Sequence, residues 1–329
     1  MRIGIIGCGN VGKKRASYLG ENELIAVADV SIDNAKDVAR IRGCENYSTD
    51  YRDVTRRDDI DLIIIATTNQ FLANITHESV LAGKHVLVEK PAGRNSKELI
   101  PIIESAKKKG IFVKVGFNHR YHPALLKAKE MTKSGAIGVL MFIRGRYGHG
   151  GRIGYDKEWR SDPDKAGGGE LIDQGVHLID LSRWFLGDLS VDYGFTSTFF
   201  WNMPVDDNAF FMLKNEKEQV AWLHVSSSEW KNTFSFEIYG IDGKLQIDGL
   251  GGSYGVEKLT YYQMLPAMGP PATIIWEYPF PDVSWQMELE YFINCILNNE
   301  VPEADIIDAK CALDIVQEIY NFKKTGRSS

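Results

Sequence analysis

The chain has 329 residues, of which 44% are hydrophobic and 25% are charged, and its formal net charge at pH 7 is -6. This composition is typical of a globular protein and excludes a disordered chain. The length allows two domains that each bury a core. The negative charge argues against a nucleic-acid partner, although backbone N–H groups can still bind phosphate locally on an acidic protein.

The cysteine pattern bears on the cellular compartment. The four cysteines show no C-x-x-C spacing, which is typical of reduced thiols in a cytosolic protein. A strand pattern begins almost at the N-terminus and leaves no room for a signal peptide. No apolar run approaches the ~20 residues of a membrane helix. His119-x-x-His122 lacks further ligands at metal spacing. We therefore expect a cytoplasmic protein with no membrane partner and no metal.

The first predicted elements are a short apolar strand at residues 2–6 and a helix from about residue 11 to residue 19. The turn between them reads G-C-G-N-V-G, a G-x-G-x-x-G dinucleotide fingerprint in its strand–turn–helix setting. Gly7 permits the tight turn, Gly9 lets the backbone approach a pyrophosphate, and Gly12 lets helix and strand pack closely. The N-terminus of the helix, at Asn10 and Val11, then presents free N–H groups to the phosphates.

A second predicted strand, at residues 24–28, ends in Asp29. A carboxylate at this position binds the ribose hydroxyls and repels a 2′-phosphate. The sequence therefore favours NAD over NADP as the cofactor. A glycine turn that binds no ligand is the alternative interpretation.

Strands and helices continue to alternate up to about residue 115. Strands are predicted at residues 61–66, 85–88 and 111–115, with helices ending at residue 82 and spanning residues 96–109. This alternation predicts a doubly wound parallel Rossmann sheet, in which ligands bind beyond the carboxyl ends of the strands. The residues expected there, beside Gly7 and Asp29, are Thr67, Asn69, Glu89 and Asn118.

A lysine follows the strand at residues 85–88, in the sequence Glu89-Lys90-Pro91. Pro91 restricts Lys90 to an extended conformation and stops the backbone from continuing as a helix. A charged lysine near a cationic nicotinamide would orient a substrate hydroxyl and lower its effective pKa. A solvated lysine at a strand end is the alternative interpretation.

Gly167, Gly168 and Gly169 precede a predicted helix and have the look of a flexible hinge. On an α-helix, Asp173, His177 and Asp180 would share one face, at positions i, i+4 and i+7. Asp173 would orient the imidazole of His177 and hold its charge when it accepts a proton. The alternative is a buried Asp–His pair that only stabilises the core. We expect Asp180 to be structural.

The pattern changes after residue 120, so we expect a dinucleotide-binding domain at residues 1–120 and a second domain at residues 121–329. Turn signals between its segments predict antiparallel pairings. The second domain begins with a predicted helix at residues 123–133. Its strand-like segments are residues 139–147, 191–201, 209–214, 219–227, 233–239 and 244–248.

A predicted loop from Gly148 to Arg160 mixes glycine, aromatic and cationic residues and should overhang a cleft. Tyr155, Trp159 and Arg160 suit a sugar ring or an anionic substituent, by stacking and by hydrogen bonds to hydroxyl groups. With Arg120 they are the candidate substrate-binding residues. A surface loop fixed by Trp159 is the alternative.

Four motifs together resemble the glucose–fructose oxidoreductase, inositol dehydrogenase and rhizopine catabolism (Gfo/Idh/MocA) oxidoreductases. They are residues 7–12, 82–91, 116–121 and 167–180. The resemblance spans nearly the whole chain. It implies that the second domain is an α+β domain with a large, mostly antiparallel sheet and helices on one face. It also implies that the other face of this sheet makes homo-oligomer contacts, in a dimer or a tetramer.

The resemblance also implies roles for three residues. Lys90 would contact substrate and nicotinamide, and Asp173 and His177 would complete the catalytic set, with His177 as the acid/base. One motif departs from the family pattern: where many members have T-P-N-x-x-H, residues 67–72 read T-T-N-Q-F-L. The proline and histidine of that motif are missing, which affects the expected contacts to ribose and nicotinamide.

The leading hypothesis is a dehydrogenase that uses NAD, or less readily NADP, on a secondary alcohol of a sugar, cyclitol or nucleotide-sugar. One alternative is a redox-neutral reaction with retained NAD, such as glycoside cleavage or an internal oxidation–reduction. Another is an NAD-binding regulatory protein without catalytic activity, like the galactose-pathway co-repressor of this family. Intact Lys90, Asp173 and His177 argue against the regulatory protein.

Overall fold

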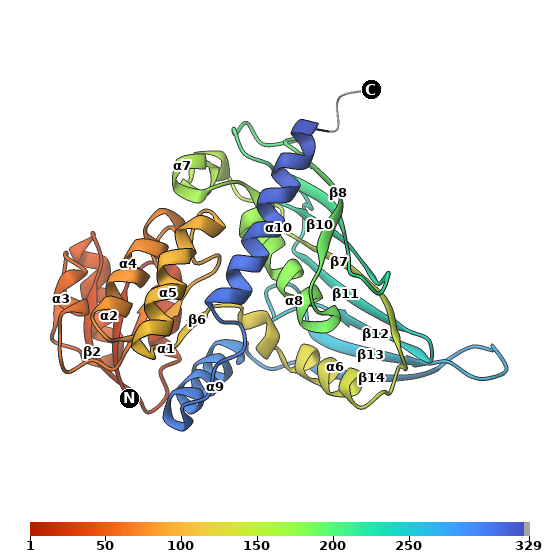
Figure 1. Ribbon diagram of the computed structural model, residues 1–329, viewed down its shortest axis with the longest axis horizontal. Helices are drawn as coiled ribbons and strands as arrows, with labels where there is room; N and C mark the ends of the chain where they lie inside the picture. The colour runs from red at the N-terminus through yellow and green to blue at the C-terminus, as the bar shows by residue number, and fades with distance from the viewer. Residues whose placement is uncertain (326–329) are drawn as a thin grey trace. The chain divides into compact units, whose positions relative to one another are not determined.

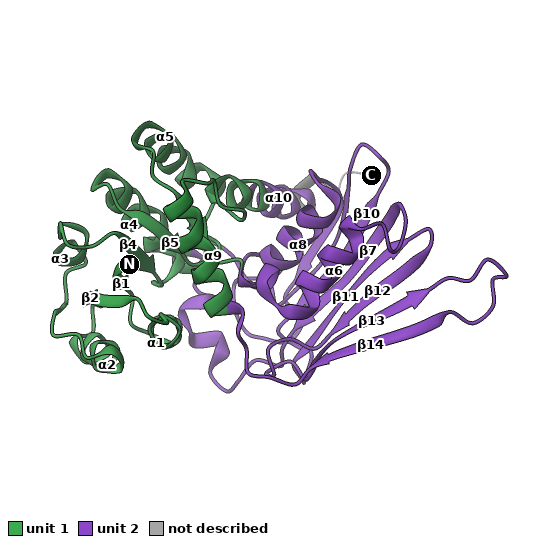
Figure 2. Ribbon diagram, turned by 90° about the horizontal axis from the view of Figure 1, so that it is seen from below, with its two compact units in different colours: residues 1–117, 164–167, 285–313 green, residues 118–163, 168–284, 314–329 purple. Residues whose placement is uncertain are grey.

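The computed structural model describes residues 1–325, and the chain forms two compact units (Figures 1 and 2). Unit 1 comprises residues 1–117, 164–167 and 285–313, and unit 2 comprises residues 118–163, 168–284 and the chain from residue 314 onward. The first boundary, after Phe117, lies close to the expected residue 120. The units are nevertheless not continuous in sequence, because two later segments return to unit 1.

Unit 1 is built on a six-stranded parallel sheet in the order β3-β2-β1-β4-β5-β6. This is the strand order of a Rossmann fold, in which the order reverses between β1 and β4. All four residues of β4 are buried, as in a parallel strand that is covered on both faces. The predicted Rossmann sheet is confirmed. Its strands are β1 (Arg2–Ile6), β2 (Glu23–Ala28), β3 (Tyr47–Ser48), β4 (Leu62–Ile65), β5 (His85–Val88) and β6 (Val113–Val115).

The helices of unit 1 come from both ends of the chain. They are α1 (Asn10–Ser17), α2 (Ile32–Arg42), α3 (Arg52–Thr55), α4 (Asn69–Leu81), η1 (Ser96–Leu99), α5 (Ile100–Lys109), α9 (Ser284–Asn298) and the first part of α10 (Ile306–Thr325). Leu289 and Phe292 of α9 join residues of α1, α2 and the sheet in one hydrophobic core. The C-terminal segment thus completes the Rossmann unit, which the sequence patterns did not indicate.

A cluster of buried charges lies inside unit 1. The guanidinium group of Arg15 lies 2.6 Å from Oε1 of Glu89 and 2.7 Å from Oε2 of Glu288, and Nζ of Lys114 is 3.6 Å from Oε1 of Glu288. The ring of Trp285 stacks under the Arg15 guanidinium at 4.4 Å. Burial raises the pKa of Glu89, and Arg15 opposes this shift only in part. The four charges compensate one another, which buried ions require.

Unit 2 contains an eight-stranded sheet in the order β14-β13-β12-β11-β7-β10-β9-β8. β7 and β10 run parallel and every other neighbouring pair is antiparallel. The predicted large, mostly antiparallel sheet is confirmed, with β13 and β14 added. The strands are β7 (Leu140–Gly148), β8 (Ser190–Ser197), β9 (Asn208–Lys214), β10 (Val220–Ser226), β11 (Thr233–Gly240), β12 (Gly243–Asp248), β13 (Glu257–Gln263) and β14 (Ala272–Tyr278).

Helices α6 and α8 cover one face of this sheet, with α6 against β12 to β14 and α8 against β7 (Figure 1). Among residues 1–325, no helix combines the length and the apolar character that crossing a membrane requires. The helical segments that begin in unit 2 are η2 (Asn118–Tyr121), α6 (Pro123–Lys133), η3 (Tyr155–Lys157), η4 (Trp159–Ser161), α7 (Pro163–Ala166), η5 (Leu171–Gly175) and α8 (Val176–Leu186).

One predicted strand is shorter than expected. The segment expected at residues 191–201 ends as strand β8 at Ser197. The backbone N–H groups of Phe199, Phe200 and Trp201 donate instead to the carboxylate of Asp207, at 2.8, 2.7 and 3.0 Å. The Asp207 carboxylate therefore accepts hydrogen bonds from backbone N–H groups that would otherwise bind the neighbouring strand, and β8 ends there.

The buried cluster of unit 1 generates a prediction about stability. Arg15→Ala leaves Glu89 and Glu288 buried without their cation, so we expect it to lower the free energy of unfolding by about 3–5 kcal/mol. The control is Arg2→Ala, which removes an ion pair to Asp61 with a 48% exposed Arg2 side chain; it should lower the free energy of unfolding far less, because solvent screens exposed ion pairs. Urea unfolding measures both. Equal losses in the two variants would contradict the assigned role of Arg15.

Candidate active site

The three-glycine segment is closely packed, so the expectation of a flexible hinge is wrong. A Cβ atom on Gly168 would lie 2.2 Å from the hydroxyl oxygen of Tyr320, and one on Gly169 would lie 1.9 Å from the carbonyl oxygen of Asp206. Real Cβ atoms do not approach that closely, so only glycine fits. The glycines permit close backbone contact rather than motion.

Asp206 binds the start of the helical segment that follows these glycines. Its carboxylate accepts hydrogen bonds from the N–H groups of Gly169 and Leu171, at 3.0 and 2.8 Å, and from the Tyr320 hydroxyl at 2.8 Å. The residue at the N-cap position, Glu170, makes no side-chain cap bond of its own. A carboxylate from a distant loop thus satisfies donors that a helix start leaves open.

The segment begins as a π-helical turn, η5, and becomes α-helical only from Val176. Asp173 lies in this turn and is partly exposed, whereas His177 and Asp180 lie in α8 and are buried. The expected single α-helical face for all three residues is therefore wrong, because a π-turn holds more residues per turn than an α-helix. Such turns are frequent at functional sites.

His177 packs in an aromatic group inside unit 2. Its ring stacks on that of His119 with a centroid distance of 3.8 Å and an interplanar angle of 21°. Tyr147 meets both imidazoles edge-on, at 5.2 Å from His119 and 6.2 Å from His177. Nδ1 of His119 lies 3.3 Å from Oδ1 of Asn118. The two histidines are thus held face to face by neighbouring rings.

Asp180 and Arg120 form a buried ion pair. Nε and Nη2 of Arg120 donate to the two carboxylate oxygens of Asp180 at 2.8 and 2.6 Å, in a bidentate geometry. The two side chains are 6% and 2% exposed. This geometry gives Asp180 a structural partner, and it engages the guanidinium of Arg120 within the protein.

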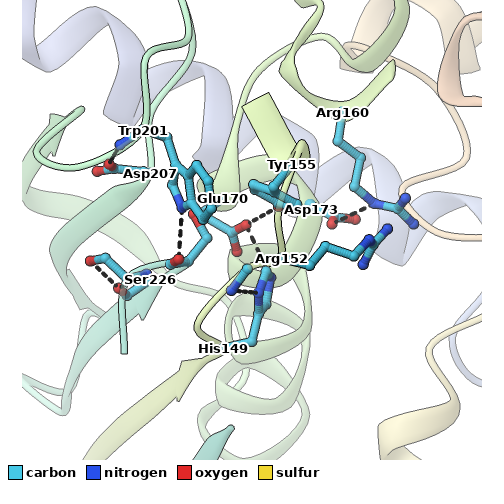
Figure 3. A network of polar contacts seen from close by, with 12 residues as sticks. His149, Arg152, Tyr155, Arg160, Glu170, Asp173, Trp201, Asp207 and Ser226 are labelled. Carbon is cyan, nitrogen blue, oxygen red and sulfur yellow. Dashed lines mark hydrogen bonds and ion pairs between the residues drawn. The ribbon is translucent and has the colours of Figure 1, made fainter. Parts of the chain in front are cut away.

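The loop before the glycines contacts the helical turn through Arg160. Nε of Arg160 donates to Oδ2 of Asp173 at 3.1 Å, and the Arg160 guanidinium stacks on the ring of Trp159 at 4.6 Å. The negative charge of Asp173 raises the pKa of Arg160 and outweighs the effect of burial. Figure 3 shows this pair beside the buried side chains of Tyr155 and Glu170.

The glycine fingerprint of unit 1 has the geometry expected of a dinucleotide turn. Gly7 has φ +92°, and a Cβ atom there would lie 2.5 Å from the backbone of Ala66. A Cβ on Gly12 would lie 2.0 Å from the carbonyl oxygen of Gly7, whereas one on Gly9 would meet no atom within 4 Å. Gly7 and Gly12 are thus required by packing. The open space at Gly9, at the N-terminus of α1 with Asn10 and Val11, fits a pyrophosphate.

Asp29 lies at the carboxyl end of β2, beside this turn. Its Oδ2 accepts the N–H of Cys8 at 2.7 Å, and its Oδ1 accepts the N–H of Ser31 at 2.8 Å. These bonds fix the carboxylate next to the fingerprint and leave further acceptor capacity for ribose hydroxyls. The residues of unit 1 therefore fit NAD.

The other predicted cofactor residues have varied surroundings. Thr67 is partly exposed, directly after β4. Asn69 is buried and donates from its side chain to the carbonyl of Ala166 at 2.9 Å. Glu89 binds Arg15, as described above. Asn118 belongs to unit 2 and donates to the hydroxyl of Ser284 at 2.9 Å.

Lys90 is presented by a buried turn. The N–H of Ala92 donates to the carbonyl oxygen of Glu89 at 3.0 Å and closes the turn around Lys90 and Pro91. Residues 86–89 and 91–93 are buried, and Lys90 between them is partly exposed. The fold thus holds the backbone on both sides of Lys90 inside unit 1.

Comparison with known proteins identifies the class. Residues 1–117 match the family model described as "Oxidoreductase family, NAD-binding Rossmann fold", and residues 125–246 match the GFO/IDH/MocA C-terminal domain. The chain belongs to the Gfo/Idh/MocA family of oxidoreductases. It is an NAD-binding enzyme of the dehydrogenase type, as predicted.

Two relatives and one solved structure show which characterised proteins the chain is similar to. It is 28% identical over 293 residues to levoglucosan dehydrogenase of Pseudarthrobacter phenanthrenivorans, covering 74% of this chain and 73% of the relative. It is 25% identical to scyllo-inositol 2-dehydrogenase (NAD(+)) of Bacillus subtilis, covering 99% and 95%. The fold matches a levoglucosan dehydrogenase in complex with NADH and levoglucosan, with a TM-score of 0.88 at 24% identity over 98% of this chain and 97% of the other.

Sequence reasoning missed the structural roles of several residues that shape these sites. They are Arg15 and Glu288 in unit 1, and His119, His149, Glu170 and Asp206 in unit 2. Glu170 carried one usable signal, a carboxylate inside an otherwise apolar and glycine-rich segment. Asp206 carried none, because its partners lie far away in the sequence.

The position of Asp29 generates a prediction about the cofactor. Asp29→Asn keeps oxygen acceptor capacity but removes the charge that repels a 2′-phosphate. We expect the ratio of kcat/KM for NADP to that for NAD to rise roughly tenfold, about 1.4 kcal/mol in relative binding. Asp33→Asn, an exposed carboxylate in the first turn of α2, is the control. An unchanged ratio in Asp29→Asn would remove Asp29 from the ribose site.

Proposed function

We propose that this protein is an NAD-dependent dehydrogenase that oxidises or reduces a secondary alcohol of a sugar, cyclitol or nucleotide-sugar. The observation that carries the proposal is the buried imidazole of His177, four residues after Asp173, in a chain whose other unit has a turn fitted to a dinucleotide. The named activities of the relatives, on levoglucosan and scyllo-inositol, support a polyhydroxylated substrate.

Each candidate residue has a role in this chemistry. NAD supplies the hydride acceptor. His177 takes the proton from the substrate hydroxyl, and returns it in the reverse direction. Lys90 stabilises the negative charge that develops on the hydroxyl oxygen. Asp173 stabilises the charged imidazole of His177, and Arg160 fixes the position of Asp173.

We propose that Trp159 and Arg160 contact the substrate. Both are partly exposed, and their stacked side chains combine an apolar ring with hydrogen-bond donors, which suits a sugar. Tyr155 and Arg120 have their polar groups engaged by Glu170 and Asp180. We therefore assign these two residues to holding the site rather than to direct contact.

The roles of Lys90 and His177 are tested by single substitutions. We expect Lys90→Ala and His177→Ala to bind NAD as the wild type does and to lose roughly 10²–10⁴-fold in kcat, because each removes a group that acts in the transition state. Turnover is followed by NADH absorbance with a panel of sugars, inositols and nucleotide-sugars, and NAD binding by calorimetry. Lys97→Ala, an exposed lysine on η1, is the control and should keep full activity.

Near-normal turnover in both variants would contradict the catalytic assignment. Sugar turnover without net NADH formation, by a protein that retains its NAD, would instead favour the redox-neutral alternative.

We further propose that the protein is a homo-oligomer that associates through the face of the large sheet opposite α6 and α8. Several large apolar side chains are exposed on its strands, among them Trp222 at 60%. The same sheet has a depression of about 400 Å³ lined by Trp222, Phe210, His224, Arg144 and Glu237. Exposed apolar patches of this kind are typical of protein interfaces.

The interface is tested by Trp222→Glu, which places a charge on the apolar face. We expect this variant to sediment as a smaller species than the wild-type dimer or tetramer in analytical ultracentrifugation, because burying an unpaired charge is costly. Lys133→Glu is the control, because Lys133 is an exposed residue of α6, which covers the other face of the sheet. A wild-type monomer, or an oligomer unaffected by Trp222→Glu, would contradict this interface.

We also propose a cytoplasmic location. Cys8, Cys44 and Cys295 are not joined in disulfide bonds, which suits a reducing compartment.

A further inference from the structure

Glu170 is a buried carboxylate that the proposed mechanism does not use. It is 1% exposed, and its Oε1 accepts the hydroxyl of Tyr155 at 2.5 Å and lies 3.3 Å from Nε2 of His149 (Figure 3). Its Oε2 is buried and makes no hydrogen bond to any residue among those described. An ionised carboxylate in such a place is costly, and its two donors must compensate for that cost.

The hydrogen bonds of His149 define its tautomer. The N–H of Gly151 donates to Nδ1 of His149 at 3.0 Å, so Nδ1 acts as an acceptor and carries no proton. The ring proton of the neutral imidazole is therefore on Nε2, which faces Glu170. In this geometry His149 donates to Glu170 and at the same time holds the glycine-rich start of the loop.

The three residues come from three separate segments. His149 directly follows β7, Tyr155 begins η3, and Glu170 directly precedes η5. One carboxylate therefore ties both the start and the middle of the loop at residues 149–160 to the turn that carries Asp173. The end of the same loop is tied to that turn by Arg160 and Asp173.

We propose that His149, Tyr155 and Glu170 form a clamp that positions the loop at residues 149–160 for sugar binding and thereby sets the affinity for the sugar. This inference rests on the proposed function, because the loop carries the proposed substrate contacts Trp159 and Arg160. The clamp residues are positioning residues, since Glu170 engages the Tyr155 hydroxyl and Nε2 of His149, and none of the three is assigned a contact with a reacting atom.

The clamp depends on pH. Protonation of His149 at Nδ1 removes the acceptor of the Gly151 N–H, although the contact from Nε2 to Glu170 remains. Burial lowers the pKa of His149. The hydrogen bond to Glu170 and the negative charges of Glu170 and Asp173 raise it by more, and Arg160 opposes them to a smaller extent. The pKa of His149 is therefore raised overall. The Gly151 bond is thus present above this pKa and is lost as the pH falls through it.

The kinetic test compares Tyr155→Phe and Glu170→Gln with a matched control. Tyr261→Phe also removes a buried tyrosine hydroxyl in unit 2, one that donates to the carbonyl of Ala136 at 2.8 Å. We expect both clamp variants to raise the KM for the sugar roughly tenfold, with kcat changed less than about threefold and NAD affinity unchanged. Tyr261→Phe should change none of the three. Thermal unfolding of all variants separates loss of fold from loss of positioning.

The pH profile and two spectroscopic measurements distinguish positioning from general stability. The wild-type KM should rise on the acid side, and Glu170→Gln should move this rise to lower pH. In ¹⁵N NMR, His149 should show the Nε2–H tautomer at high pH, and hydrogen exchange at the Gly151 amide should be faster in Glu170→Gln than in Tyr261→Phe. These two readouts need no turnover, so they remain informative if the proposed dehydrogenase activity fails. Clamp variants that match Tyr261→Phe in KM, pH profile and Gly151 exchange would overturn the proposal.

Discussion

The contact between Gly169 and Asp206 is the constraint on which the arrangement of unit 2 depends. The backbone of Gly169 lies so close to Asp206 that no side chain fits there, and the Asp206 carboxylate binds the first N–H groups of the following helical segment. Tyr320, from the last helix, donates to the same carboxylate. One buried acid therefore fixes where the segment carrying Asp173 and His177 begins. A glycine run that looks flexible in sequence is rigid because its neighbours fill the space that side chains would occupy.

Two of the three candidate catalytic residues, Lys90 and His177, lie beside a buried ion pair. Lys90 follows Glu89, which is bound to Arg15, and His177 precedes by one helical turn Asp180, which is bound to Arg120. Buried pairs of this kind are weak evidence for added stability, because desolvation offsets much of their attraction. They do restrict the positions of their side chains, because separating either pair would leave a buried charge without its partner. In each unit, the acidic member of the ion pair therefore lies close in sequence to the candidate catalytic residue.

Much of the fold follows from local signals in the sequence. The strand at residues 85–88 and the helix at residues 123–133 have the predicted bounds, because apolar runs and prolines mark their ends. The glycine fingerprint was readable for the same reason: its spacing reflects steric limits at Gly7 and Gly12 within one short turn. The candidate residues of the site were found by motif and resemblance.

The features that sequence reasoning missed depend on contacts between distant segments. The predicted strand at residues 191–201 stops early because Asp207 captures the N–H groups of residues 199–201. The π-turn at η5 and the return of α9 to the Rossmann unit also have no local signature. The sequence places Glu89 at the ligand-binding edge of the sheet, yet its carboxylate is bound by Arg15 of helix α1. Periodicity cannot show which side chain will satisfy a buried charge.

The role of His177 as the acid/base is tested most directly by the pH dependence of hydride transfer. Single-turnover NADH formation is followed with a sugar substrate, unlabelled and deuterated at the reacting carbon, in the wild type and in His177→Asn. The account predicts a wild-type rate that falls at acid pH as the base becomes protonated. It also predicts a slow variant that lacks this fall and is accelerated by added imidazole. A variant that keeps the wild-type acid limb, the wild-type isotope effect and the wild-type rate would contradict the account.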